Sequence, residues 1–246
     1  MAIENKVIVI TGGASGIGLA LAKHFILNNT VVSIDRNPKK IELLKIEVPK
    51  VISLKADICN KTEIEKGVAE IKSSFSKIDM LVHSAGIGRF YNFDAMPEDE
   101  LLSLAETEIA TDFVAPILIT KKCLPLLKQS PDPKIVYITT GLAYMPDTAS
   151  PTYCSSKVGL HFFAMSLRHQ LKDTNIKVIE VLPAAVDTEF SKGIDVPKIS
   201  TEKFVKSFVG KLEKGKTTIR IGMANVLYML SRFFPSLAFK IINGKK

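Results

Sequence analysis

The chain has few cysteines and no tryptophan among its 246 residues. Its three cysteines, Cys59, Cys123 and Cys154, lie far apart and show no Cys-x-x-Cys spacing. An odd, scattered set of this kind excludes a disulfide framework and does not predict a structural zinc site. The four histidines show no metal-ligand spacing with carboxylates or cysteines, so we expect no bound metal.

Long apolar runs are also missing. The most apolar stretch, residues 226–242, is broken by Arg232, Pro235 and Lys240, so it falls short of the roughly 18 apolar residues of a membrane-spanning helix. Residues 1–6 lack the basic region, apolar core and cleavage site of a secretory signal. We therefore expect a cytoplasmic protein that does not cross a membrane.

Acidic residues are in the minority: 25 Asp and Glu stand against 33 Lys and Arg, which gives a net charge of +8. A charged fraction of 24% with 46% hydrophobic residues excludes wholesale disorder and a fibrous repeat. Acidic residues interrupt the densest lysine run, residues 192–216, and no aromatic pattern suited to base stacking accompanies it. We expect no nucleic-acid partner; a solvated surface or an anionic substrate explains the charge better.

Short runs rich in Val and Ile alternate with segments that carry helix-start signals. The apolar runs are residues 7–10, 31–34, 51–54, 78–82, 135–138 and 176–182. The helix-start signals are Asn37-Pro38, Asn60, Pro97 and Ser150-Pro151. This alternation predicts the α/β class: a single Rossmann-type, doubly wound parallel sheet with helices on both faces. Without a repeat or linker, we expect one domain over residues 1–246.

A glycine-rich loop, residues 11–18, follows the first apolar run and precedes a helical pattern. A loop of this kind presents backbone N–H groups and the positive end of a helix to a pyrophosphate, and its missing side chains allow close approach. The spacing is G-x-x-x-G-x-G, and a mere tight turn is the alternative. The predicted pyrophosphate contacts are Gly12, Ser15, Gly16, Ile17 and Gly18.

Asp35 ends the second apolar run, where a dinucleotide needs a contact to its adenosine ribose. A carboxylate there accepts hydrogen bonds from the 2′-OH and repels a 2′-phosphate, which favours NAD. Arg36 could instead bind a 2′-phosphate. We therefore expect NAD, with NADP as the alternative.

Tyr153 and Lys157 are four residues apart, which places a phenol and an ammonium on one face of the helix that begins at Pro151. A phenol with its ordinary pKa of about 10 is a poor base near neutral pH unless a positive charge stabilises the phenolate. Lys157, together with an oxidised nicotinamide, would supply that charge.

The glycine loop, Tyr153 and Lys157 at these separations resemble the short-chain dehydrogenase/reductase family over about residues 6–188. The resemblance implies an NAD(P)-dependent oxidoreductase that transfers a hydride between nicotinamide and a small secondary alcohol or ketone. The proton would pass through Tyr153, while Lys157 lowers the pKa of the phenol and holds the nicotinamide ribose.

Two catalytic positions of the family differ in this chain. The family's Ser, 13 residues before the Tyr, is Thr140, whose hydroxyl can make the same hydrogen bond. The family's Asn in the long fourth helix is Asp112, whose charge would pair with Lys157 and weaken its effect on Tyr153. These departures leave an alternative open: a cofactor-binding protein with little or no turnover, acting as a sensor or scaffold.

The family's remaining cofactor positions are also partly altered. Its Asn-Asn-Ala-Gly motif is His83-Ser84-Ala85-Gly86 here, and its Pro-Gly after the sixth strand is Pro183-Ala184. The cofactor contacts that the resemblance implies are Asp57, Ile58, Ser84, Ala85, Gly86, Tyr153, Lys157, Val186 and Thr188.

Three further expectations concern the second half of the chain. The helix after Pro151 is more apolar than one sheet-facing stripe requires. We expect this second apolar face to form a subunit contact in a homo-oligomer, a dimer or tetramer; the alternative is that the C-terminal segment of the same chain covers it. The resemblance places a substrate lid at about residues 189–216. The apolar segment 223–246 is interpreted first as a lid or subunit contact and second as a peripheral membrane contact.

The C-terminal segment, with residues 111–116 and 141–144, also resembles the branch of the family that is encoded beside genes for lipoteichoic acid D-alanylation. The substrate of that branch does not follow from its sequence.

Overall fold

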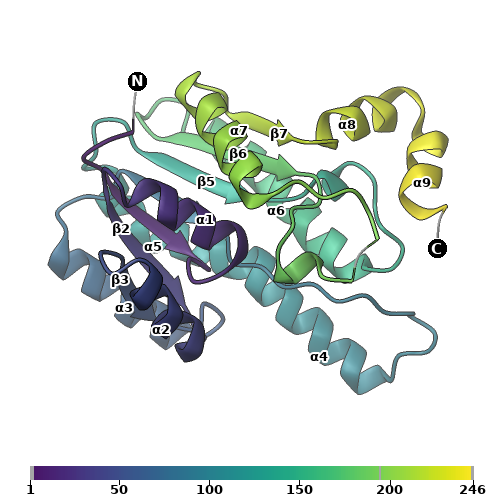
Figure 1. Cartoon of the computed structure of the whole chain (residues 1–246), viewed down its shortest axis with the longest axis horizontal. Coiled ribbons are helices and arrows are strands. Elements are labelled where there is room, and N and C mark those ends of the chain that lie inside the picture. Colours follow the sequence, from purple (N-terminus) through teal and green to yellow (C-terminus); the bar gives the residue numbers. More distant parts are fainter. Residues whose placement is uncertain (1–2, 194, 245–246) are drawn as a thin grey trace.

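The computed structural model describes residues 3–193 and 195–244. Its centre is one sheet of seven parallel strands in the order β3-β2-β1-β4-β5-β6-β7, with helices on both faces (Figure 1). The strands are β1 (Val7–Thr11), β2 (Thr30–Asp35), β3 (Ile52–Lys55), β4 (Met80–His83), β5 (Lys134–Ile138), β6 (Lys177–Pro183) and β7 (Thr218–Ile221). The predicted fold class is confirmed.

Six of the longer helices cover the sheet in two layers, and the others lie outside these layers. The helices are α1 (Gly16–Phe25), α2 (Pro38–Glu47), α3 (Lys61–Ser74), α4 (Glu98–Ile109), the π-helical turn η1 (Ala110–Val114), α5 (Ala115–Leu127), the 3-10 turn η2 (Gly141–Ala143), α6 (Pro151–Gln170), the 3-10 turn η3 (Glu189–Ser191), α7 (Thr201–Glu213), α8 (Ala224–Phe233) and α9 (Pro235–Asn243). Apolar side chains of α1, α2 and α7 pack on one face of the sheet, and those of α3, α5 and α6 pack on the other. Because both faces are covered, the central strands are mostly apolar and buried, with a few buried polar side chains such as Ser33 and Glu180.

Asparagine side chains fix the starts of two helices. Asn37 accepts hydrogen bonds from the backbone N–H groups of Lys39 and Lys40 at the start of α2. Asn60 does the same for Thr62 and Glu63 at the start of α3. Both caps satisfy N–H groups that have no partner within the helix.

The order of the strands determines where a ligand can bind. β1 pairs with β2 on one side and with β4 on the other, so the chain changes its direction across the sheet between these two pairings. In open parallel sheets the crevice outside the carboxyl ends of the strands at this switch point binds ligands. The loops that follow β1 and β4 both begin at this switch point.

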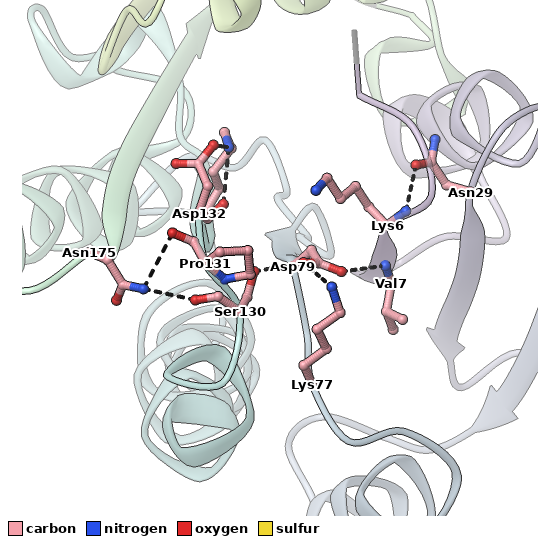
Figure 2. Close-up of polar contacts among 10 residues, drawn as sticks. Lys6, Val7, Asn29, Lys77, Asp79, Ser130, Pro131, Asp132 and Asn175 are labelled. Atoms are coloured by element: carbon pink, nitrogen blue, oxygen red, sulfur yellow. Dashed lines mark hydrogen bonds and ion pairs between the residues drawn. The ribbon is translucent and has the colours of Figure 1, made fainter. Parts of the chain in front are cut away.

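At the opposite end of the sheet, where the strands begin, Asp79 links several segments by hydrogen bonds. Its carboxylate accepts hydrogen bonds from the backbone N–H of Val7 at 2.9 Å, the Ser130 hydroxyl at 2.6 Å and the Lys77 ammonium at 3.0 Å (Figure 2). Burial raises the pKa of Asp79, but these donors outweigh it and hold the pKa below its usual range. One carboxylate therefore joins the starts of β1 and β4 to the end of α5.

The structure adds one strand that the sequence analysis did not predict. β7 has four residues and pairs with β6 alone, at the edge of the sheet. Its alternation of Thr, Ile, Arg and Ile is typical of a half-buried edge strand, whereas the six predicted strands are mostly apolar runs.

The segment predicted as a substrate lid, residues 189–216, divides into two parts. Its second part is α7, which packs on the sheet through the fully buried Phe204 and Phe208. A helix in this core cannot open without unfolding the layer. The lid therefore stays a prediction for the part before α7.

Within the described ranges, no helix is both long and apolar enough to span a bilayer.

Candidate active site

The glycine loop between β1 and α1 requires glycine at several positions. Gly12 and Gly16 have φ values of +69° and +53°, which favour a residue without Cβ. A Cβ on Gly12 would also lie 2.8 Å from the Cα of Ala85, and one on Gly18 would clash with the carbonyl oxygen of Gly12. The loop thus folds tightly against the end of β4.

The start of α1 differs from the starts of α2 and α3. Ser15 occupies the N-cap position, but its side chain makes no capping hydrogen bond, and the first turn contains no acidic residue. The first-turn N–H groups, including those of Gly16 and Ile17, therefore receive no side-chain oxygen from the cap. This helix end fits a pyrophosphate, because the N–H groups and the helix dipole both favour an anion.

The end of β2 presents the predicted ribose-binding carboxylate. Asp35 accepts hydrogen bonds from the N–H groups of Ala14, at 3.3 Å, and Asn37, at 3.0 Å, so it is held beside the glycine loop. Arg36 lies 3.4 Å from a carboxylate oxygen of Asp57, which follows β3. The side chain of the neighbouring Ile58 is buried in the apolar layer of α3.

The segment after β4 is fastened to β1. The Thr11 hydroxyl accepts hydrogen bonds from the N–H groups of Ser84, at 3.2 Å, and Ala85, at 3.3 Å. A Cβ on the next residue, Gly86, would lie 3.1 Å from both the Asp112 carboxylate and the Lys157 ammonium. Glycine therefore lets the backbone lie directly over these two charged groups.

The segment after β6 lies beside the glycine loop. Val186 is buried, and Thr188 caps η3 together with Ser191. A Cβ on Gly16 would lie 3.5 Å from the Thr188 methyl group, so this segment lies close to the glycine loop.

Lys157 and Asp112 form a buried ion pair. The ammonium lies 3.6 Å from a carboxylate oxygen, and both side chains are almost fully buried. Asp112 also accepts hydrogen bonds from the N–H of Ile87, at 3.0 Å, and the Ser156 hydroxyl, at 3.4 Å. Burial raises the pKa of Asp112 to about 6, although Lys157 and the Ile87 N–H both lower it. Asp112 lies in the π-helical turn η1, a feature frequent at functional sites.

Tyr153 lies one helical turn before Lys157, whose ammonium is 5.9 Å from the centre of the phenol ring. Burial raises the pKa of Tyr153, and the charge of Asp112 raises it further, while a hydrogen bond with Thr140 lowers it. Thr140 is buried and also accepts a hydrogen bond from the N–H of Leu142 at 3.2 Å. The structure thus brings all four predicted catalytic side chains together, and the predicted pairing of Asp112 with Lys157 is present.

Two residues of this site, Glu108 and Phe190, were missed by the sequence analysis. Glu108 is fully buried and accepts hydrogen bonds from the N–H of Arg89, at 2.9 Å, and from the hydroxyl of Thr152, the residue before the tyrosine. Phe190 packs on the Tyr153 ring with centroids 5.4 Å apart, and a Cβ on Gly88 would lie 2.9 Å from both rings. Glu108 interrupts an apolar stripe of α4, and that interruption was the available signal.

His83 replaces the first Asn of the family motif and belongs to the packing of the sheet. Its ring stacks on Tyr137 at 4.9 Å, and its Nε2 lies 2.8 Å from the Thr120 hydroxyl. Burial, reinforced by the charge of Lys157, lowers its pKa to about 3. The imidazole is therefore neutral at physiological pH and carries no charge into the site.

Comparisons with known proteins agree with this geometry. Residues 6–198 match the family model described as short chain dehydrogenase. The chain is 33% identical over 226 residues to the uncharacterized oxidoreductase DltE of Bacillus subtilis, with 89% of each chain covered. It is 30% identical over 192 residues to an NAD-dependent glycerol dehydrogenase of Listeria innocua, covering 77% of this chain and 74% of the relative.

A solved structure shares the fold. A short chain dehydrogenase from Burkholderia cenocepacia, in complex with NADP, matches with a TM-score of 0.86 at 23% identity, over 98% of this chain and 99% of that one. The family model covers more than three quarters of this chain, including the glycine loop, Tyr153 and Lys157. The predicted family is confirmed: this chain belongs to the short-chain dehydrogenases.

Proposed function

We propose that this chain is an NAD(P)-dependent oxidoreductase that interconverts a secondary alcohol and its ketone. The convergence of Tyr153, Thr140 and Lys157 beside the crevice carries the proposal. The tight glycine loop and the uncapped start of α1 at the same crevice fit a dinucleotide.

Each catalytic side chain has a role that follows from its position. When bound, the nicotinamide accepts or donates the hydride. Tyr153 exchanges a proton with the substrate oxygen, and Thr140 orients that oxygen by a hydrogen bond. Lys157 stabilises the phenolate through its charge, and Asp112 holds the ammonium and the Ile87 N–H in place.

The adenosine end of the crevice favours NAD over NADP. The fixed Asp35 carboxylate can accept hydrogen bonds from a ribose 2′-OH and would repel a 2′-phosphate. Arg36, the competing cation, is turned toward Asp57. The Listeria innocua relative is named as NAD-dependent, whereas the Burkholderia cenocepacia structure contains NADP, so NADP is the alternative to test.

The substrate side of the crevice is partly apolar. Phe190 lies over Tyr153, and Phe90, on the segment after β4, is exposed. We infer a substrate with an apolar part beside the reacting carbon.

The test compares the chain with its Tyr153→Phe variant. We expect oxidation or reduction of at least one member of a panel of secondary alcohols and ketones, followed by nicotinamide absorbance with each dinucleotide. The variant should lose turnover while its dinucleotide affinity, measured by calorimetry, stays within about twofold. Full activity of the variant would refute the role of Tyr153. Tight dinucleotide binding without turnover of any substrate would support the cofactor-binding alternative.

We also propose a homo-oligomer. On α6, Phe162 and Met165 are exposed by 60% and 46%, and the C-terminal helices do not cover them. The adjacent α4 and η1 add exposed Leu102, Ile109 and Val114. An apolar surface of this kind on two packed helices is typical of a subunit contact.

A further inference from the structure

The last two helices form a projection at one end of the molecule, beyond the edge strand β7 (Figure 1). Only one residue in each helix is buried, Ala224 in α8 and Ala238 in α9. Helices that bury so little of themselves against their own chain leave most of their apolar surface in water.

Most exposed apolar side chains of these helices follow a helical period. Two sets have spacings of three and four: Val226, Met229 and Phe233 of α8, and Phe234, Leu237 and Ile241 at the start of α9 and within it. Their exposed fractions run from 45% for Val226 to 67% for Phe233. We call these six residues the α8–α9 face. Phe239 of α9 is also exposed but falls outside this spacing.

The charge within the C-terminal segment itself has one sign. Residues 214–246 contain seven Lys and Arg and no Asp or Glu. Arg232 and Lys240, which lie within the two helices, are exposed. An amphipathic surface with exposed aromatics and only basic charges complements an interface of anionic lipid headgroups.

A second copy of the chain fits this surface less well. A two-fold contact would bring this basic segment of one copy against the same segment of the other, and no carboxylate of the segment could compensate Arg232 and Lys240. The homo-oligomer proposed above uses α4 and α6 instead. The basic charge of the segment therefore favours an anionic lipid surface over a second copy of the chain.

The α8–α9 face is also fixed relative to the site. The Asn243 side chain donates to the carbonyl of Pro146 at 3.1 Å and accepts from the N–H of Thr148 at 2.8 Å. Arg220 donates to the Tyr144 hydroxyl at 2.8 Å and lies 3.8 Å from the Tyr228 ring of α8. The face is thus joined to the loop between β5 and α6, just before Tyr153.

We propose that the α8–α9 face docks on the surface of bilayers that contain anionic lipids, with its aromatic side chains at the level of the headgroups. The proposal does not depend on catalytic activity, so its test and the test of the proposed function can fail separately.

Flotation of the full chain with vesicles tests the proposal. We expect it to float with vesicles that mix phosphatidylglycerol and phosphatidylcholine, and to bind pure phosphatidylcholine more weakly. The double variant Phe233→Ser/Phe234→Ser should reduce the partition coefficient by about tenfold or more. The variant Arg232→Gln/Lys240→Gln should weaken binding to the anionic vesicles only.

A matched control lies at the other edge of the sheet. Leu43 and Ile46 of α2 are exposed by 58% and 75%, and the variant Leu43→Ser/Ile46→Ser should float like the original chain. The proposal is overturned if the original chain does not float with anionic vesicles, or if both serine double variants lose binding equally. It is also overturned if Phe233→Ser/Phe234→Ser lowers the mass in light scattering without changing flotation, because a second copy then occupies the face.

Discussion

Replacing Asp112 by Asn should make Tyr153 a stronger acid. The Asp112 carboxylate lies 3.6 Å from the ammonium that would stabilise the phenolate, and its charge also raises the pKa of Tyr153 directly. Both effects oppose deprotonation of the phenol. Asn removes the charge but keeps an oxygen that can accept from the Ile87 N–H, so the segment over the site should keep its place.

The size of the effect follows from the distances. At the 5.9 Å between the Lys157 ammonium and the Tyr153 ring, two unit charges in an effective dielectric of about 20 interact by about 3 kcal/mol, or about two pKa units. Because the paired carboxylate cancels part of this, its removal should lower the pKa of the phenol by about one unit.

The assay measures the rate of alcohol oxidation against pH for the original chain and Asp112→Asn, with saturating dinucleotide. The rate of the variant should rise at a pH lower by about one unit. The pKa of Asp112 is raised to about 6, so the original carboxylate is charged near neutral pH and above, where the comparison is made. An unchanged or higher apparent pKa in the variant would refute the electrostatic reasoning. Thermal unfolding of both proteins checks that each is folded in the assay, because Asn leaves Lys157 without its ionic partner.

Three further outcomes follow from the structure. Gly12→Ala should lose dinucleotide binding, and its free energy of unfolding in urea should fall by more than about 1 kcal/mol, because φ at Gly12 is positive and Ala85 is too close for a Cβ. The control Gly67→Ala in α3 meets no neighbouring atom, so its free energy of unfolding should stay the same or rise. Asp35→Ala should shift the ratio of NADP to NAD affinity toward NADP by about tenfold or more in calorimetry, and an unchanged ratio would contradict the assigned role of Asp35. Asp79→Asn should lower the free energy of unfolding in urea by about 1–3 kcal/mol near neutral pH. Because the pKa of Asp79 is lowered on folding, its stabilisation is present above the ordinary Asp pKa and disappears as the pH falls through the folded pKa. A loss of stability that persists in strong acid would contradict this account.

The sheet could be predicted from the sequence because its strands are buried on both faces. A run such as residues 135–138 is apolar at every position, and the helix between two such runs has a recognisable cap in Asn37 or Asn60. β7 was missed because an edge strand is half-buried, and its four alternating residues resemble many surface segments. Likewise, the sequence did not show that α7 belongs to the core, because its lysines outnumber its buried aromatics, Phe204 and Phe208.

The site was predictable where one residue type determines the chemistry and unpredictable where position determines it. Residue type and spacing identify Tyr153, Lys157 and the glycines in the sequence. They do not identify Glu108 as a site residue, since a glutamate near the end of a helix is usually solvated. In the structure it is fully buried and its charge raises the pKa of both Asp112 and Tyr153. Two carboxylates thus oppose one ammonium around the phenol, so the free protein should hold Tyr153 protonated, and its function as a base depends on the positive charge that an oxidised dinucleotide adds.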